Sequence, residues 1–84
     1  STTIAAHLTD LRNGTVKASA GVMNPQIRFG EDLMSRVSYA MMNPGGDREM
    51  TRAVREAIDG LAGSLAEQAG IEAHDILEAV FVCN

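Results

Sequence analysis

Hydroxyl and amide side chains that could contact a phosphate occur at two places in this sequence. Ser1, Thr2 and Thr3 come directly before an alternating apolar stretch. A hydroxyl-rich turn ahead of a strand can offer backbone N–H and hydroxyl donors to an anion. Asn24 and Gln26 follow the second of two predicted strands. If those strands pair antiparallel, both groups lie at the same rim, which predicts either an anion- or nucleotide-facing site or a solvated turn.

The histidines and the cysteine of the sequence do not indicate a metal site or a reactive thiol. His7 falls in a predicted strand and His74 in a predicted turn, and neither has further ligands at the spacing of a zinc or iron site. We therefore expect no metal site. Cys83 has no electropositive neighbour in the sequence that would lower its thiol pKa, so we expect a small buried hydrophobe rather than a nucleophile.

Two further groups have a structural and a functional interpretation. Glu31 and Asp32 could be a catalytic pair, but adjacent helix positions point in different directions, so charge that complements the helix dipole is favoured. We expect no certain catalytic residue in this segment. The methionines could form a partner-binding surface, but their helical spacing favours the core; they are Met23, Met34, Met41, Met42 and Met50.

The elements that position these residues form one α/β unit over residues 1–84, of the α+β kind. We predict a β-hairpin over 3–23, a helix over 31–43, a helix over 48–69 and a strand over 76–83. Asn13-Gly14 predicts a type I′ hairpin turn, which needs positive φ at both central residues. Gly21 suggests a bulge or a close backbone approach.

The helices show apolar stripes with clear stops. The first has its stripe on Leu33, Met34, Val37, Ala40 and Met41 and ends at Asn43-Pro44. The second can be capped by Asp47, and Gly70 followed by Ile71 predicts a left-handed C-terminal cap. Gly60 and Gly63 inside it would make sense if another backbone packed close there. Its predicted seam is Met50, Val54, Ala57, Ile58, Leu61 and Leu65.

Charge and composition restrict the function class. Seven Lys and Arg against eleven Asp and Glu give a net charge of −4, and the basic residues are scattered, so no nucleic-acid partner is expected. No apolar run reaches the roughly 20 residues that span a bilayer, so no membrane partner is expected either. A single cysteine fits a reducing compartment, and the cytoplasm is the predicted location.

The apolar run at 76–83 predicts a strand buried on both faces, for which the hairpin supplies too few neighbours. We therefore expect this chain to be a piece of a larger protein. The run would either pair directly with residues 3–11 or borrow a strand from another chain, and unpaired strand edges would allow a homo-oligomer.

Several motifs occur together in the order Ser1-Thr2-Thr3, Asn24-Pro25-Gln26, Arg28, Gly30, Asp32, Ser35-Arg36 and Asn43-Pro44-Gly45-Gly46. With this order the chain resembles the start of the ATPase domain of the reductive activators of corrinoid enzymes. Their pattern runs roughly D-x-G-[ST]-T-T, then N-P-Q-x-R-x-G-x-D-x-x-S-R, then N-P-G-G. The stretch ILEAVFVCN is similar to the family's apolar strand before a V-x-G-N turn.

The resemblance implies a ribonuclease H-like fold of the actin, acetate-kinase and sugar-kinase superfamily, here a partial ATPase subdomain with a β-hairpin, two helices and one buried strand. It implies that the parent carries a [2Fe-2S] ferredoxin-like module, a linker and middle domain, and this ATPase with ATP and Mg²⁺. The parent would return Co(II) corrinoid to Co(I) on a methyl-transfer partner protein. The nucleotide-facing residues that it implies are Ser1, Thr2, Thr3, Asn24, Gln26, Asp32 and Asn84.

The chain also departs from the family pattern. The Asp-x-Gly that precedes the hydroxyl run in the family is absent, and Cys83 stands where the family has a glycine. We therefore expect the segment alone neither to hydrolyse ATP nor to carry electrons. Two alternatives stay open: a piece of another kinase-like ATPase, and a non-catalytic structural or interaction module.

Overall fold

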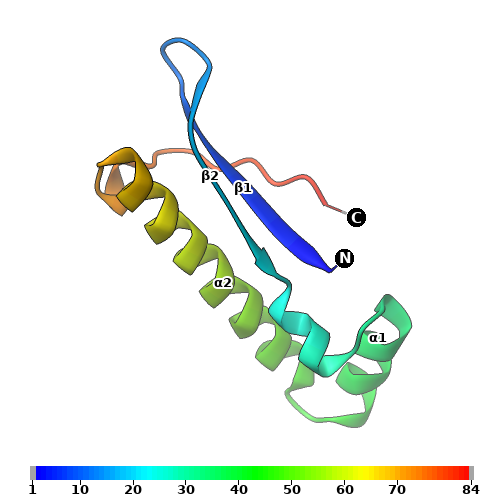
Figure 1. The fold of residues 1–84 in the computed structure, drawn as a ribbon. Helices are drawn as coiled ribbons and strands as arrows, with labels where there is room; N and C mark the ends of the chain where they lie inside the picture. The colour runs from blue at the N-terminus through cyan, green and yellow to red at the C-terminus, as the bar shows by residue number, and fades with distance from the viewer. Residues whose placement is uncertain (1, 84) are drawn as a thin grey trace.

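The computed structural model describes residues 2–83, and Figure 1 shows a β-hairpin lying along one long helix with a shorter helix at one end. The elements follow in the order β1 (Thr3–Asp10), β2 (Thr15–Met23), the 3₁₀ helix η1 (Pro25–Phe29), α1 (Leu33–Met42), α2 (Gly46–Ala69) and the 3₁₀ helix η2 (Ala73–Asp75). The predicted α+β class, with a hairpin followed by two helices, is confirmed.

The hairpin is a two-stranded antiparallel sheet in which Thr3 pairs with Met23 and Leu8 with Ala18. Exposed and half-buried residues alternate along β1 because one of its faces lies toward α2. The outer face carries His7, whose Nδ1 lies 2.8 Å from the hydroxyl oxygen of Ser19 on the neighbouring strand. Among residues 2–83 the sheet thus packs on α2 with one face, and the residues of β1 on its other face are exposed.

The turn between the strands differs from the predicted type I′ turn. It runs from residue 11 to residue 14, and Gly14 is the residue with positive φ, at 71°. The Asp10 carbonyl accepts the Gly14 N–H at 2.8 Å, and the Asp10 carboxylate accepts the Arg12 N–H at 2.9 Å. These bonds stabilise a longer loop with a single left-handed residue, which makes positive φ at Asn13 unnecessary.

A β-bulge does occur, but away from Gly21. The register shifts between Leu8, which pairs with Ala18, and Thr9, which pairs with Val16, so Lys17 is the extra residue. A Cβ placed on Gly21 would meet only ordinary contacts, the nearest being the Ile4 carbonyl at 3.5 Å. The bulge prediction was therefore wrong in position.

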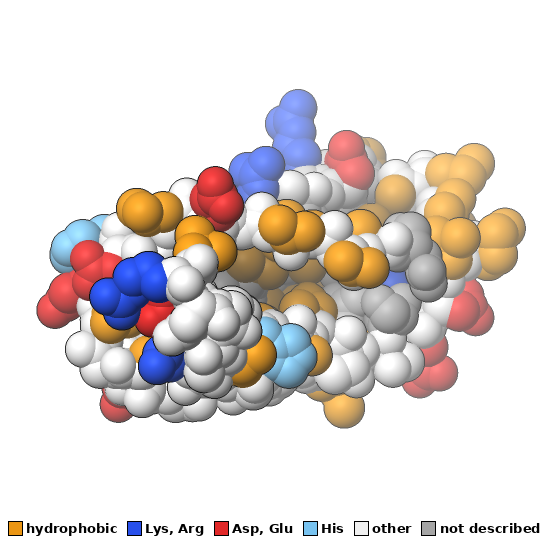
Figure 2. All heavy atoms as spheres, turned by 90° about the horizontal axis from the view of Figure 1, so that it is seen from above, with side chains coloured by type: hydrophobic (Ala, Val, Ile, Leu, Met, Phe, Trp, Pro, Cys, Tyr) orange, Lys and Arg blue, Asp and Glu red, His pale blue; other side chains and the backbone are white. Residues whose placement is uncertain are grey.

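α1 begins at Leu33, two residues later than predicted, because Asp32 is its N-cap. Its apolar stripe faces away from the rest of the molecule, with exposed side chains at Leu33, Met34, Val37, Met41 and Met42. Figure 2 shows hydrophobic side chains gathered at the end of the molecule where α1 lies. The assignment of the methionines to the core is wrong for all but the half-buried Met50. Within residues 2–83 α1 contacts only η1 and α2, so nothing covers this stripe.

α2 begins at Gly46 rather than at Arg48, because Gly45 takes the left-handed conformation at the N-cap position in place of the predicted Asp47. Its C-terminal cap is confirmed. Gly70 has a φ of 72°, and the Ile71 N–H donates to the Ala66 carbonyl at 2.9 Å. The helix supplies most of the small core, whose buried apolar residues are Ala18, Ala53, Leu61, Leu65 and Ala66.

The two interior glycines of α2 are not sites of close packing among the described residues. A Cβ at Gly60 or at Gly63 would meet nothing within 4 Å. The expected close backbone approach is therefore absent from residues 2–83. Gly60 instead borders a shallow hollow of about 340 Å³ between α2 and β2, next to Gly21.

The strand predicted over 76–83 is not formed. The sheet of the described residues contains β1 and β2 alone, and residues 76–83 have no regular secondary structure. Only Ile76 is half-buried there. The physical reason is that a strand needs a neighbour for its backbone hydrogen bonds, and the segment has none. The Cα radius of gyration is 15.0 Å, against about 12 Å for a compact 84-residue domain, so the fold is extended.

Candidate phosphate-facing rim

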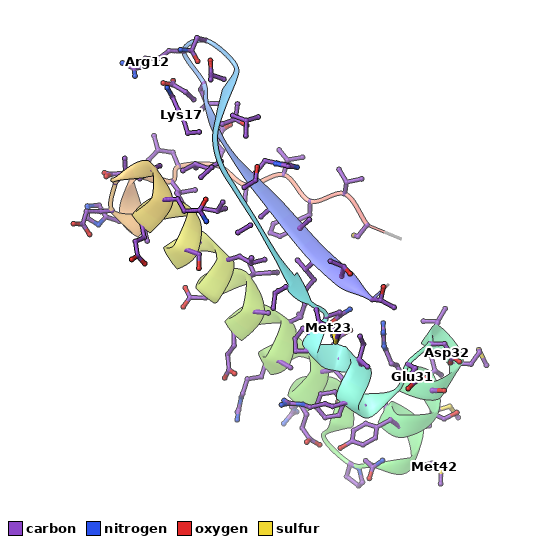
Figure 3. All side chains as sticks on the ribbon, viewed as in Figure 1. Arg12, Lys17, Met23, Glu31, Asp32 and Met42 are labelled. Carbon is purple, nitrogen blue, oxygen red and sulfur yellow. The ribbon has the colours of Figure 1, made fainter. Side chains whose placement is uncertain are left out.

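The two predicted groups of polar residues meet at the base of the hairpin. Thr3 lies opposite Met23, and the Asn24 N–H donates to the Thr2 carbonyl at 2.8 Å. Figure 3 shows Met23 at this base and Glu31 at the same end of the molecule, with the hairpin tip far away. The expected meeting of hydroxyl and amide residues at one rim is confirmed for the described residues. Ser1 and Asn84 lie outside the residues that the structure describes.

Asn24 has a structural task at this rim. The residue is 7% exposed, and its Oδ1 accepts the Gln26 N–H at 2.9 Å. That bond caps η1, where Pro25 occupies the first helical position and, having no N–H, needs no acceptor. The first Asn-Pro pair therefore turns the chain out of β2 and starts the connector, as the sequence predicts, and the amide oxygen is engaged in doing so.

Gln26 also bonds within the protein. Its Nε2 donates to the Met50 carbonyl of α2 at 3.0 Å, across 24 positions of the sequence. This bond joins the connector to the long helix, and the residue is half-buried. The side-chain donor that the sequence offered to a phosphate thus holds η1 against α2.

Asp32 remains exposed at the start of α1, and its Oδ1 accepts the Ser35 N–H at 2.8 Å. Hydrogen bonds from the Ser35 backbone and then from its hydroxyl lower the pKa of Asp32, since they stabilise the carboxylate. The negative charge predicted for the first turn of this helix lies just before it, because Asp32 is the N-cap and the first turn itself contains no acidic residue. An ionised carboxylate repels phosphate oxygens unless a cation bridges the two groups.

The structure shows a positioning contact between two motif residues, Gly30 and Arg36, that the sequence analysis did not predict. Gly30 approaches α1 so closely that a Cβ there would stand 2.7 Å from the Arg36 nitrogen. Arg36 in turn donates from Nε to the Gly30 carbonyl at 2.8 Å. Gly30 and Arg36 therefore contact each other, and both belong to the family pattern N-P-Q-x-R-x-G-x-D-x-x-S-R. Their spacing of six residues in that pattern is the signal that could have predicted the contact.

An aromatic cluster holds the second Asn-Pro turn. The rings of Phe29 and Tyr39 lie 5.0 Å apart, and the Tyr39 hydroxyl donates to Glu49 at 3.2 Å. A Cβ at the buried Gly46 would stand 2.9 Å from the Tyr39 ring. Burial, and then the bond to Glu49, raise the pKa of Tyr39. The cluster fixes α1 relative to α2 and so fixes where Asp32 lies.

The polar side chains at the rim differ in how accessible they are. The exposed residues at the hairpin base are Thr2 and Thr3, while Asn24 and Gln26 are bonded internally. Asp32 caps α1, which contacts neither strand of the hairpin among residues 2–83, so no contact brings Asp32 to this base. No three His, Cys, Asp or Glu side chains among residues 2–83 are grouped to hold a metal ion. The helices of the described chain are also too short or too polar to cross a membrane.

Comparison with known proteins decides the family. The family model described as the RACo middle region matches residues 1–84. The chain belongs to the RACo middle-region family. The resemblance to reductive activators of corrinoid enzymes is thereby confirmed. The family description assigns these residues themselves to the middle region, whereas the resemblance places a middle domain upstream of them.

Two relatives of this RACo middle region are much longer proteins. The corrinoid activation enzyme RamQ of Eubacterium limosum is 28% identical over 83 residues, which make up 99% of this chain and 14% of RamQ. A solved structure of a reductive activator for corrinoid, iron-sulfur protein has 37% sequence identity and a TM-score of 0.81. That match covers 84% of this chain and 11% of the activator. The chain therefore spans only a small part of either relative.

Proposed function

We propose that this RACo middle region supplies the first part of an actin-like ATPase domain in an ATP-dependent reductive activator. The whole protein would return Co(II) corrinoid to Co(I) on a methyl-transfer partner protein. The observation that carries the proposal is the family match over residues 1–84, together with the hairpin base that brings Thr2 and Thr3 beside Asn24. The other polar groups of an ATP site would come from the rest of the protein.

The described rim fits a minor share of an ATP and Mg²⁺ site. Thr2 and Thr3 are exposed, so their hydroxyls are accessible to a phosphate oxygen. Asp32 keeps a carboxylate ionised, which suits a Mg²⁺ ion with its water ligands. Bound Mg²⁺ and ATP would supply a cleavable phosphoanhydride, and the contribution of this chain would be to orient it.

A [2Fe-2S] cluster does not fit this chain. Such a cluster takes four thiolate ligands, and the chain has one cysteine, Cys83. We place the cluster in a separate module of the whole protein and derive no step through it here. The proposal includes a cytoplasmic protein whose partner is a corrinoid protein rather than a nucleic acid or a membrane, consistent with the net charge of −4.

The function is tested on the full-length protein with its corrinoid partner. Absorbance spectra of the corrinoid would report Co(II) and Co(I) under a strong reductant, with and without ATP. We expect Co(I) to accumulate only when the activator, ATP and Mg²⁺ are all present. Accumulation at the same rate without ATP would contradict the proposal.

The rim is tested with a matched pair of threonines. Thr3 and Thr9 are both exposed on the outer face of β1, at its opposite ends. Replacing either with valine removes a hydroxyl and keeps the β-branched shape. In the full-length protein, Thr3→Val should lower ATP hydrolysis several-fold, while Thr9→Val should leave it unchanged. Equal rates in both variants would remove Thr3 from the nucleotide site.

A non-catalytic interaction module is the second candidate, favoured by the exposed apolar stripe of α1 and by the internal bonding of Asn24 and Gln26. In that case the full-length protein would bind the corrinoid protein, and Thr3→Val would change neither hydrolysis nor binding. Leu33→Asp on the stripe would instead weaken the binding.

A further inference from the structure

The apolar side chains of residues 77–82 face water. Leu77 is 84% exposed, Val80 88%, Phe81 66% and Val82 96%. Exposed apolar surface of this kind marks an interaction site. The run is rich in β-branched and aromatic residues, which favour strands, and Glu78 is its one charged residue.

The solvent-accessible surface of residues 2–83 and the two terminal residues together is larger than that of a compact monomer of the same mass. Its accessible surface is 6466 Å², whereas a compact monomer of this mass exposes about 4,800 Å². The difference exceeds the roughly 800 Å² that each partner buries in a standard protein interface. Pairing with a second copy could therefore bury enough area for a stable dimer.

β1 offers a matching row of unpaired backbone groups. The Thr2 carbonyl points toward β2, because it accepts the Asn24 N–H. Backbone groups alternate in direction along a strand, so Thr3, Ala5, His7 and Thr9 point away from β2. None of the bonds found among residues 2–83 pairs these outward groups, and such an edge is a template for another strand.

The outer edge of β2 is less suited to pairing. Lys17 is the extra residue of the bulge there. Bulges and lysines on edge strands twist the edge and discourage pairing. The free edge of β1 is regular from Thr3 to Leu8, because the register shift comes only after Leu8.

The pleat fixes the face that each side chain takes, and pairing Glu78 with His7 then selects one register. Side chains alternate between faces, so placing the charged Glu78 on the outer face puts Leu77, Ala79 and Phe81 on the face toward α2. In an antiparallel pair, Phe81 then lies beside Ile4 and Glu78 beside His7. Apolar groups meet apolar groups on the inner face, and opposite charges meet on the outer face when the histidine is protonated.

We propose that residues 76–83 of one copy add as a third, antiparallel strand to the β1 edge of a second copy, and reciprocally. Phe81 of each copy covers Ile4 of the other. This pairing is a property of the 84-residue chain and does not depend on the proposed activator function. It gives the apolar segment a hydrogen-bonding partner that residues 2–83 of the same copy do not supply.

The first test is the molar mass of the chain in solution, by size-exclusion chromatography with light scattering over a concentration series. We expect a concentration-dependent dimer. Phe81→Asp should raise the dimer dissociation constant at least about tenfold, because it places a charge on the buried face. Leu11→Asp is the matched control, since Leu11 is also an exposed apolar residue, 74% exposed, but lies in the hairpin turn. A strict monomer at every concentration, or equal effects of both variants, would overturn the proposal.

The second test fixes the register through Cys83. In the proposed register Cys83 lies opposite Thr2 of the other copy, in a non-hydrogen-bonded pair with Cα atoms about 4.5 Å apart, which suits a disulfide. Thr2→Cys should give a disulfide-linked dimer with the 2–83 link found by mass spectrometry, and Thr9→Cys should not. A disulfide within one chain, or a link from Thr9→Cys but not from Thr2→Cys, would overturn the proposal.

Discussion

The ring of Tyr39 lies directly on Gly46, with its Cε1 2.9 Å and its Cδ1 3.0 Å from where a Cβ would stand. This contact explains the second glycine of the Asn-Pro-Gly-Gly turn. Gly45 provides the left-handed conformation, with φ at 79°, and Gly46 provides the space for the ring. The turn thereby sets the distance between α1 and α2.

Gly46→Ala should therefore destabilise the chain by about 1–3 kcal/mol, because the ring has to leave its position. Gly63→Ala is the control in the same helix. Nothing lies within 4 Å of a Cβ there, so alanine should stabilise the helix by up to about 1 kcal/mol. Urea unfolding followed by circular dichroism measures both. If Gly46→Ala stabilised the chain as Gly63→Ala is expected to, Tyr39 would not pack on Gly46.

Gln26→Ala should cost about 1 kcal/mol of unfolding free energy, because its bond from Nε2 to the Met50 carbonyl is lost. Gln68→Ala serves as the comparison, since Gln68 is an exposed glutamine of α2 for which no such bond exists among residues 2–83. Thermal or urea unfolding distinguishes the two. No difference between the variants would mean that the η1–α2 contact does not depend on Gln26.

Asp32 should make the stability of α1 depend on pH. Its pKa is lowered in the folded chain, so its contribution is fully present above the unfolded value, about 3.9, and is lost as the pH falls through the lower folded value. Asp32→Ala should lower the stability at neutral pH, whereas Asp32→Asn should keep much of the cap. The Asn variant should lack this acid dependence. Circular dichroism of the chain between neutral and acid pH would measure this loss of helix. If Asp32→Asn lost helix at acid pH as the unmodified chain does, the role of the Asp32 carboxylate as a cap would be contradicted.

At the other end of the hairpin, Arg12 holds the pKa of Asp10 down to about 2, chiefly through its side-chain hydrogen bonds and then through its backbone N–H. The two charged groups are 3.0 Å apart. Arg12→Ala should raise the pKa of Asp10 toward about 3.9, and Lys17→Ala should move it much less. Carboxyl chemical shifts in an NMR titration report this directly. A pKa for Asp10 that is the same in both variants would rule out the arginine as the cause.

Local signals predicted much of the fold because they act over a few residues. The Asn13-Gly14 pair placed the hairpin reversal, although the loop is longer and Gly14 alone is left-handed. Gly70 marked the end of α2, and its cap bonds are the expected ones. Proline after asparagine ended β2, since it has no N–H for a ladder. In each case a conformational constraint of one or two residues is enough.

The rim could be predicted only in part. Pairing of the strands brings Thr2 next to Asn24 by geometry alone, so the meeting of the two groups followed from the sequence. The bond from Gln26 to Met50 joins residues 24 apart, and no local pattern reveals it. A polar side chain near a predicted site can equally cap a helix or bridge two elements.

By itself, the sequence determined where the chain turns, which segments become hairpin and helices, and which family the motifs belong to. Only the tertiary structure decided which surfaces are buried. The stripe of α1 and the run at 76–83 have the composition of a core, yet both face solvent. The physical reason is that turns and helices are stabilised by bonds within a segment, whereas burial and strand formation require a second surface at the right distance.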